Sequence, residues 1–261
     1  MSIHKNIKLN HLLASWPPGL VRVSKYLSKN GYTPQLMKRY VKSQWVRSLY
    51  EGAYVKLKDE PSIYGVLNAL REQSGLAIHL GGVSALEYYG YAQYYNLAPV
   101  GPHYIYVSDE KKQTLAKWAQ TLSLKLNYVN KHLFRNFVGL EKKEEGDIAF
   151  TISRPERAIL ELLSLVPKNF SMEFASENLE NLQGLDPRLT QELLEQCSSI
   201  KVKRLFLYLA EEKGLPCFKK LNIARIDLGK GKRVIGEGGN YSRKYGISVP
   251  VIHGEAGEDY V

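Results

Sequence analysis

Prolines and glycines divide the first 58 residues at short intervals, and this spacing limits what the segment can fold into. A Pro-Pro-Gly sequence at residues 17–19 ends a first helix, whose apolar positions have the spacing of one helical face: Leu9, Leu12 and Leu13. Ser24 is the expected N-cap of a second helix over residues 25–30, and Gly31 closes that helix as the residue after its C-cap. The sequence therefore predicts two short helices before residue 32.

A third helix is expected to begin almost at once and to run from about residue 34 to residue 46. Thr33 is its N-cap, and Pro34 is its first residue, where a missing N–H costs nothing. The positions expected to face a core have helical spacing: Met37, Tyr40, Val41 and Trp45. Two short strands follow at residues 46–50 and 53–57, joined by a tight turn at Gly52. Helix, helix, turn, helix and β-hairpin is the order of a winged helix-turn-helix.

The same segment carries all of the excess positive charge of the chain. Residues 1–58 hold eleven basic side chains and one acid, Glu51, so 11 − 1 gives +10, which equals the formal net charge of the whole chain. The remaining 25 basic and 25 acidic residues cancel. Charge segregated in this way indicates a polyanionic partner, and duplex DNA is the first candidate.

Polar and basic side chains occupy the face of the third helix opposite its apolar positions. A recognition helix needs this division, because one face must fix the helix while long side chains on the other reach base edges and phosphates. The predicted DNA-binding residues of this helix are Gln35, Lys38, Arg39, Lys42 and Ser43. Two alternatives stay open: a solvated basic face without a partner, and a surface that binds RNA.

The sequence after residue 58 predicts a larger domain of mixed α/β structure. Residues 59–62 are a candidate linker, which gives a winged-helix domain over residues 1–60 and a second domain over residues 61–261, and the fold class is α+β. Helices are expected at residues 63–73, 84–91, 111–122, 171–182, 187–197 and 202–213. A further helix follows a capping-box pattern at Ser153-Arg154-Pro155-Glu156. Strands are expected at residues 104–107, 125–129, 148–152, 223–228, 233–235 and 247–252.

A second basic region lies near the end of the chain. Residues 201–244 hold 12 basic and 4 acidic side chains, whereas residues 59–200 hold 13 basic and 18 acidic ones. The acidic middle could meet a basic partner or could be a solvated surface. The candidate second basic surface consists of Lys219, Lys220, Lys230, Lys232, Arg233, Arg243 and Lys244. A glycine-rich segment at residues 236–240 is expected to be a turn between strands, with a phosphate contact as the alternative.

The chemistry expected of an enzyme or a metal protein is missing from the sequence. Cys197 and Cys217 make no disulfide framework, and the histidines lack the spacing of metal ligands. No Asp-x-Asp or Glu-x-Glu metal pair, nucleophile elbow or Walker-type loop is present. A glycine pair at residues 81–82 could cradle a phosphate or could only permit a helix to begin. We therefore expect no catalytic residue, no metal, no cofactor, no membrane segment and a cytoplasmic protein.

The order of several segments resembles the AbiEi-type antitoxins of bacterial type IV, or abortive-infection, toxin–antitoxin systems. These segments are SKYLSKNGYTPQLMKRYVKSQWVRSLYEGAYV, GGVSALEYYGYA, TISRPERAILELLSLVP, KVKRLFLYLAEEKGLPCFKKLN, RIDLGKGKRVI and YSRKYGISVPV. The resemblance implies an autorepressor that binds inverted repeats in its own promoter. It also implies an antitoxin that counters a nucleotidyltransferase-like toxin, without necessarily contacting it. It places Arg47, Tyr54 and Lys56 on the wing that would contact DNA.

Two other functions are weighed against the antitoxin. One is an enzyme with an unrecognised nucleotide-dependent activity, which the missing carboxylate pairs and phosphate loop disfavour. The other is an interaction protein whose acidic middle binds a basic toxin directly.

Overall fold

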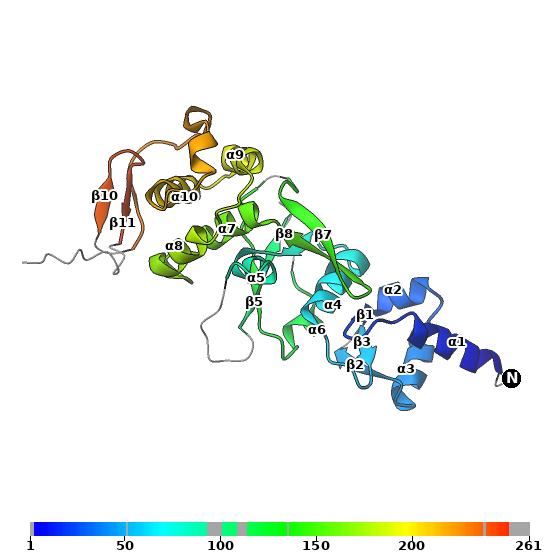
Figure 1. Ribbon diagram of the computed structural model, residues 1–261. Coiled ribbons are helices and arrows are strands. Elements are labelled where there is room, and N and C mark those ends of the chain that lie inside the picture. The colour runs from blue at the N-terminus through cyan, green and yellow to red at the C-terminus, as the bar shows by residue number, and fades with distance from the viewer. Residues whose placement is uncertain are drawn as a thin grey trace, which may run out of the picture. The chain divides into compact units, whose positions relative to one another are not determined.

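The computed structural model describes residues 3–50, 52–92, 101–108, 114–134, 136–236 and 239–250. These residues form helices and several small sheets (Figure 1), so the predicted α+β class is confirmed. The chain divides into two compact units. The first contains residues 1–80, 98–130 and 141–152, and the second contains residues 81–97, 131–140 and 153–261.

The first unit begins with a small module, residues 3–60, which we call the N-terminal module. Its elements are α1 (Ile3–Ala14), β1 (Arg22–Val23), α2 (Ser24–Lys29), α3 (Pro34–Lys42), β2 (Val46–Tyr50) and β3 (Ala53–Lys56). The strands form a sheet of order β1-β3-β2, in which both pairings are antiparallel. Gly52 turns the chain between β2 and β3 at φ 87°. The elements follow the order expected of a winged helix-turn-helix, with one short strand, β1, that the sequence did not predict.

An apolar cluster holds the helices of the N-terminal module together. It contains Leu9, Leu12, Trp16, Leu20, Leu27, Tyr32, Met37, Tyr40 and Val46. Trp16 is 1% exposed and donates its indole N–H to the Leu20 carbonyl at 2.7 Å. The large ring is therefore buried without an unsatisfied donor.

Two helix boundaries in the module differ from the sequence prediction. The N-cap of α2 is Val23, and Ser24 is already helical because β1 leads directly into the helix. Helix α3 ends at Lys42, about a turn before the predicted end. Its end is made by Gln44, whose φ of 57° takes the chain out of the helix. The N-cap Thr33 and the first residue Pro34 are confirmed.

The rest of the first unit contains a five-stranded sheet. The helical elements are α4 (Ile63–Asn68), its π-helical continuation η1 (Ala69–Gln73) and α6 (Lys117–Gln120). The strands are β4 (Ile78–Leu80), β5 (His103–Val107), β6 (Leu126–Val129), β7 (Leu140–Glu145) and β8 (Ile148–Ser153), in the order β6-β5-β4-β8-β7. Only part of the helix predicted at residues 111–122 lies within the described residues. The acidic residues Glu144 and Glu145 belong to β7, so only a short turn separates this strand from β8.

Helix α4 packs closely against the N-terminal module. A Cβ added to Gly65 would lie 2.1 Å from the Gly19 carbonyl oxygen, so only glycine permits this approach. The Gln73 side chain accepts from Val23 N at 3.0 Å and donates to the Val21 carbonyl at 2.8 Å, which satisfies backbone groups around β1. The module is thus tied to the elements that follow it, and the division between domains at residues 60 and 61 stays a prediction.

The second unit is mainly helical and ends in a small sheet. Its elements are α5 (Gly82–Tyr88), α7 (Pro155–Ser164), α8 (Met172–Glu180), α9 (Pro187–Gln196), α10 (Ile200–Glu212), η2 (Phe218–Lys220), η3 (Ile223–Arg225), β9 (Arg233–Val234), β10 (Asn240–Ser242) and β11 (Ile247–Val249). The sheet has the order β10-β11-β9, with β11 antiparallel to β10 and parallel to β9. Helix α7 is buried over Glu156–Ser164 and forms the centre of the unit.

Two predictions in the second unit are wrong. The capping box at α7 does not form, because Arg154 is the N-cap and the Ser153 hydroxyl donates instead to Glu161 at 2.8 Å. The strand expected at residues 223–228 is replaced by the 3₁₀ helix η3, in which Arg225 N donates to Asn222 O at 3.2 Å.

Candidate nucleic-acid interface

Helix α3 is fixed to the N-terminal module by its cap and its apolar face. The Thr33 hydroxyl accepts a hydrogen bond from Leu36 N at 3.3 Å. Met37 and Tyr40 are 1% and 7% exposed and pack into the apolar cluster. Because one side of the helix is anchored, the opposite side is presented in a defined orientation.

The five residues predicted to contact DNA from α3 and its C-cap are all exposed: Gln35, Lys38, Arg39, Lys42 and Ser43. No ion pair holds Lys38, Arg39 or Lys42 within the described part of the chain. The first turn of α3 contains no acid, and the last turn contains Arg39 and Lys42, which the negative end of the helix dipole favours. These three cations, which we call the α3 cations, form a surface suited to phosphates.

The predicted wing residues are held differently. Arg47 forms an ion pair with Glu60 at 2.8 Å and donates to the Asp59 carbonyl at 2.9 Å. Lys56 lies 3.5 Å from the Asp59 carboxylate. Tyr54 is partly buried against the apolar cluster. The segment predicted as a linker therefore neutralises both wing cations, and the structure does not bring them into one exposed set with α3.

One residue of this surface was missed by the sequence analysis. Trp45 was expected in the core, yet its side chain is 50% exposed. This expectation assumed that α3 continued to residue 46. The sequence did not show the earlier end of the helix, because residue 44 is glutamine and not the glycine that usually marks such an end. Tyr50 and Leu57, on the hairpin, are also exposed, by 42% and 40%.

The residues of the candidate second basic surface are all exposed, but they come from separate elements. Lys219 and Lys220 belong to η2, and the others lie in or beside β9, β10 and β11. Lys232 Nζ lies 5.0 Å from the centre of the Tyr241 ring. Lys244 binds the Glu211 carboxylate, and this bond, followed by one from the Tyr245 hydroxyl, lowers the pKa of Glu211. The glycine-rich turn beside these strands lies partly outside the described residues.

A buried arginine organises the loops of this C-terminal sheet. The Arg204 side chain belongs to α10 and is 4% exposed. Its guanidinium donates to the carbonyls of Leu228, Gly229, Gly231 and Gly246 at 2.6–3.1 Å. Neighbouring Lys203 is also buried and donates to the Asp227 carbonyl at 2.9 Å. Both cations are used within the fold and are not available to a partner.

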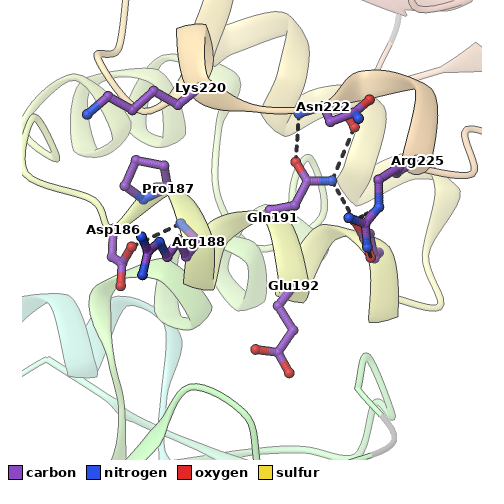
Figure 2. A pocket seen from close by; sticks show the side chains of 9 residues that line it. Asp186, Pro187, Arg188, Gln191, Glu192, Lys220, Asn222 and Arg225 are labelled. Carbon is purple, nitrogen blue, oxygen red and sulfur yellow. Dashed lines mark hydrogen bonds and ion pairs between the residues drawn. The ribbon is translucent and has the colours of Figure 1, made fainter.

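A pocket of about 700 Å³ lies in the second unit and is lined mainly by polar side chains of α9 and the segment around η3 (Figure 2). Gln191 pairs its amide with the backbone of Asn222, donating at 3.1 Å and accepting at 2.9 Å. Arg225 forms an ion pair with Glu195 at 3.0 Å, and Asp186 caps α9. These groups bind one another, and the lining contains no activated nucleophile. Across the described residues, no group of three or more His, Cys, Asp or Glu could hold a metal ion.

Two other sets of buried polar groups, around Glu161 and around His79, bind partners within the chain. Glu161 accepts from Gly82 N at 3.0 Å and pairs with Arg157 Nε at 2.9 Å. At the start of α5, the Gly82 N–H is therefore bound to a carboxylate of the chain itself, which disfavours a phosphate there. His79 and Ser108 lie 2.6 Å apart but are 0% and 5% exposed, so no substrate reaches them.

Two protein-family models match the chain. A model described as the N-terminal domain of the AbiEi antitoxin transcriptional regulator matches residues 5–97. One described as the AbiEi antitoxin transcriptional regulator of type IV toxin–antitoxin systems matches residues 103–250. No curated protein matches the sequence.

A crystal structure of the RV2827C protein from Mycobacterium tuberculosis has the same fold, with a TM-score of 0.60 and 13% sequence identity. The match covers 92% of this chain and 89% of that one. Within the described ranges, no helix is long and apolar enough to cross a bilayer. The two family matches together span nearly the whole sequence, and the chain belongs to the AbiEi antitoxin transcriptional regulators of type IV toxin–antitoxin systems.

Proposed function

We propose that this protein is an autorepressor that binds duplex DNA through helix α3 and recognises inverted repeats in the promoter of its own operon. The observation that carries the proposal is the set of three α3 cations, Lys38, Arg39 and Lys42, exposed on a helix whose other face is anchored. Cations of this kind position a protein on phosphates, and Gln35 at the start of the helix supplies a group that can read a base edge. Arg47, Tyr54 and Lys56 are secondary candidates, because reaching DNA would require the two cations to leave their acidic partners.

The antitoxin role follows from membership of the family. We propose that the protein counters a nucleotidyltransferase-like toxin, that it acts in the cytoplasm, and that it is not itself an enzyme. Growth of cells that express the toxin, with and without this protein, tests the role. Rescue by the wild type but not by an unrelated DNA-binding protein is the expected result.

Fluorescence anisotropy with the promoter duplex tests the repressor role. A scrambled duplex of equal length is the control, at two salt concentrations. Specific binding is typically about 10³-fold or more tighter than non-specific binding, and each neutralised phosphate adds to the salt dependence. Equal, weak binding to both duplexes would contradict the proposal.

A further inference from the structure

The end of helix α3 has a backbone conformation that is unusual for the residue that adopts it. Gln44 N donates to the Val41 carbonyl at 3.0 Å and Trp45 N donates to the Tyr40 carbonyl at 3.0 Å, which is the bonding of a Schellman motif. The left-handed position of that motif usually holds glycine, but here it holds Gln44 at φ 57°. Among the described residues, Gln44 is the only residue other than glycine with a positive φ. Backbone strain of this kind concentrates at functional sites.

The next residue exposes a large apolar ring. Trp45 is 50% exposed, whereas Trp16 and Trp118 are 1% and 4% exposed. The residue at this position of a Schellman motif commonly packs its side chain back on the helix. Trp45 instead leaves half of its surface in water, next to Leu57, whose N–H donates to the Trp45 carbonyl at 3.1 Å. Trp45 and Leu57, both exposed and joined by this hydrogen bond, form a small apolar patch on a strained corner, and contiguous apolar patches mark interaction sites.

The charges around this corner indicate what that partner is. Lys42 precedes it on α3 and Lys58 follows Leu57, and both are exposed. Asp59 and Glu60 are engaged with Lys56 and Arg47. Glu51, the remaining acid of the N-terminal module, lies outside the described residues. Within the described residues, no ion pair holds Lys42 or Lys58. An exposed aromatic ring close in the fold to two such cations suits the DNA backbone, where deoxyribose alternates with phosphate.

We propose that Gln44 and Trp45 form a second contact with duplex DNA, in which Trp45 packs on a deoxyribose beside a phosphate bound by Lys42. The inference rests on the proposed repressor function and adds a contact outside the recognition helix. Gln44 forms the corner through its left-handed backbone, and its exposed amide supplies a donor for the same phosphate backbone. The contact positions α3 on the duplex and carries little sequence information of its own.

Intrinsic tryptophan fluorescence of the full-length protein tests this contact directly. Because the other two tryptophans are buried, Trp45 provides the emission that acrylamide quenches most readily. Adding the promoter duplex should reduce quenching by acrylamide, and a W45F variant should lose this protection. Binding measured independently by anisotropy keeps the two proposals separate.

Three variants complete the test. W45A should weaken binding of the promoter duplex by about tenfold, which corresponds to about 1.4 kcal/mol, with a thermal midpoint close to that of the wild type. W45F, which keeps an aromatic ring, should recover most of the affinity. The matched control is F137A, which removes a ring of similar exposure, 57%, from the second unit and outside both basic regions of the sequence, and it should leave binding unchanged.

The outcomes separate this inference from the proposed function. Tight promoter binding with equal affinities for wild type and W45A, and no DNA protection from acrylamide, would overturn the inference and leave the repressor intact. Failure of the wild type to bind would overturn both. A third outcome would assign the corner to self-association instead. In that case, raising the protein concentration without DNA would protect Trp45 from acrylamide, and sedimentation would show a dimer that the W45A variant does not form.

Discussion

The two basic regions of the chain differ in what their charges bind. On α3, Lys38, Arg39 and Lys42 are exposed, and no ion pair holds them within the described residues. In the C-terminal region, Lys244 binds Glu211, and the buried Arg204 donates to backbone carbonyls. Formal charge counted along a sequence therefore overstates the charge that a partner can meet. The three α3 cations are all available, whereas in the later region Lys203 and Arg204 stabilise loops and Lys244 is paired.

The two basic regions differ in available charge because their helices are buried to different extents. Helix α3 lies at the edge of a small module, so only one of its faces can be buried. Helix α10 is buried along most of its length, and its cations Lys203 and Arg204 must be satisfied internally because an unpaired buried charge is very unfavourable. The same residue types therefore have different roles, according to how much of the helix is covered.

The largest effect is expected at a cation used within the fold. Arg204→Ala removes the donor for four loop carbonyls and should lower the free energy of unfolding by about 3 kcal/mol, since hydrogen bonds to charged groups are worth about 1.5–3 kcal/mol each. Chemical denaturation measures the loss, and proteolysis should map it to residues 228–249. Arg204→Lys should recover only part of the lost free energy of unfolding, because an ammonium cannot span the same four carbonyls. Unchanged stability would show that Arg204 is not needed to hold the loops.

The next largest effect is expected on the available cations. Changing Lys38 and Arg39 together to Ala should weaken promoter binding by about 2 kcal/mol, or about 30-fold. The salt dependence should become shallower by about two phosphate contacts. Because both side chains are exposed, the thermal midpoint should hardly change. Anisotropy and a thermal melt on the same samples measure both quantities.

The matched control for that double variant is Lys230→Ala with Arg233→Ala in the second basic region. Both of these residues are exposed, so stability should again be preserved. If the comparison between the regions is correct, binding falls far less than in the α3 variant. Equal losses would show that the C-terminal cations contact DNA as strongly as α3 does.

The N-terminal module was predictable because its signals are local. Thr33 and Pro34 begin α3 as expected, and Gly31 and Gly52 adopt positive φ values of 80° and 87° where the turns require them. The exposed side of α3 followed from helical spacing, since residues opposite the core positions must face solvent. No tertiary information was needed for these elements.

The features that could not be predicted depend on contacts between residues distant in sequence, or on a helix end that no glycine marks in the sequence. Arg47 carries a wing pattern, but only the folded chain brings Glu60, which follows the hairpin, against it. Trp45 has core spacing only if the helix continues, and Gln44 ends it without a glycine. The charged strand β7 shows no apolar alternation because it lies at the edge of its sheet.

A smaller effect is expected from relieving the strain at the end of α3. Gln44→Gly places the preferred residue at φ 57° and should raise the free energy of unfolding by about 1 kcal/mol. Promoter binding should weaken a few-fold if the Gln44 amide contacts the backbone. Urea denaturation and anisotropy measure the two changes. A stability gain with unchanged binding would limit the contact at this corner to Trp45.

The smallest effect is expected from a variant that tests whether the wing cation Arg47 can bind DNA as the α3 cations are proposed to do. Glu60→Gln removes the charge that pairs with Arg47, and because Glu60 is largely exposed the ion pair is worth no more than about 1 kcal/mol of stability. Without this partner, the Arg47 side chain is free to reach a phosphate, so promoter binding should tighten by a few-fold at low salt. The gain should be smaller at high salt, where screening weakens the attraction between Arg47 and the phosphate. Part of that gain reflects the removed negative charge itself. The double variant Glu60→Gln with Arg47→Ala separates the two causes: a gain that persists is general electrostatics, whereas a gain that disappears assigns a DNA contact to Arg47.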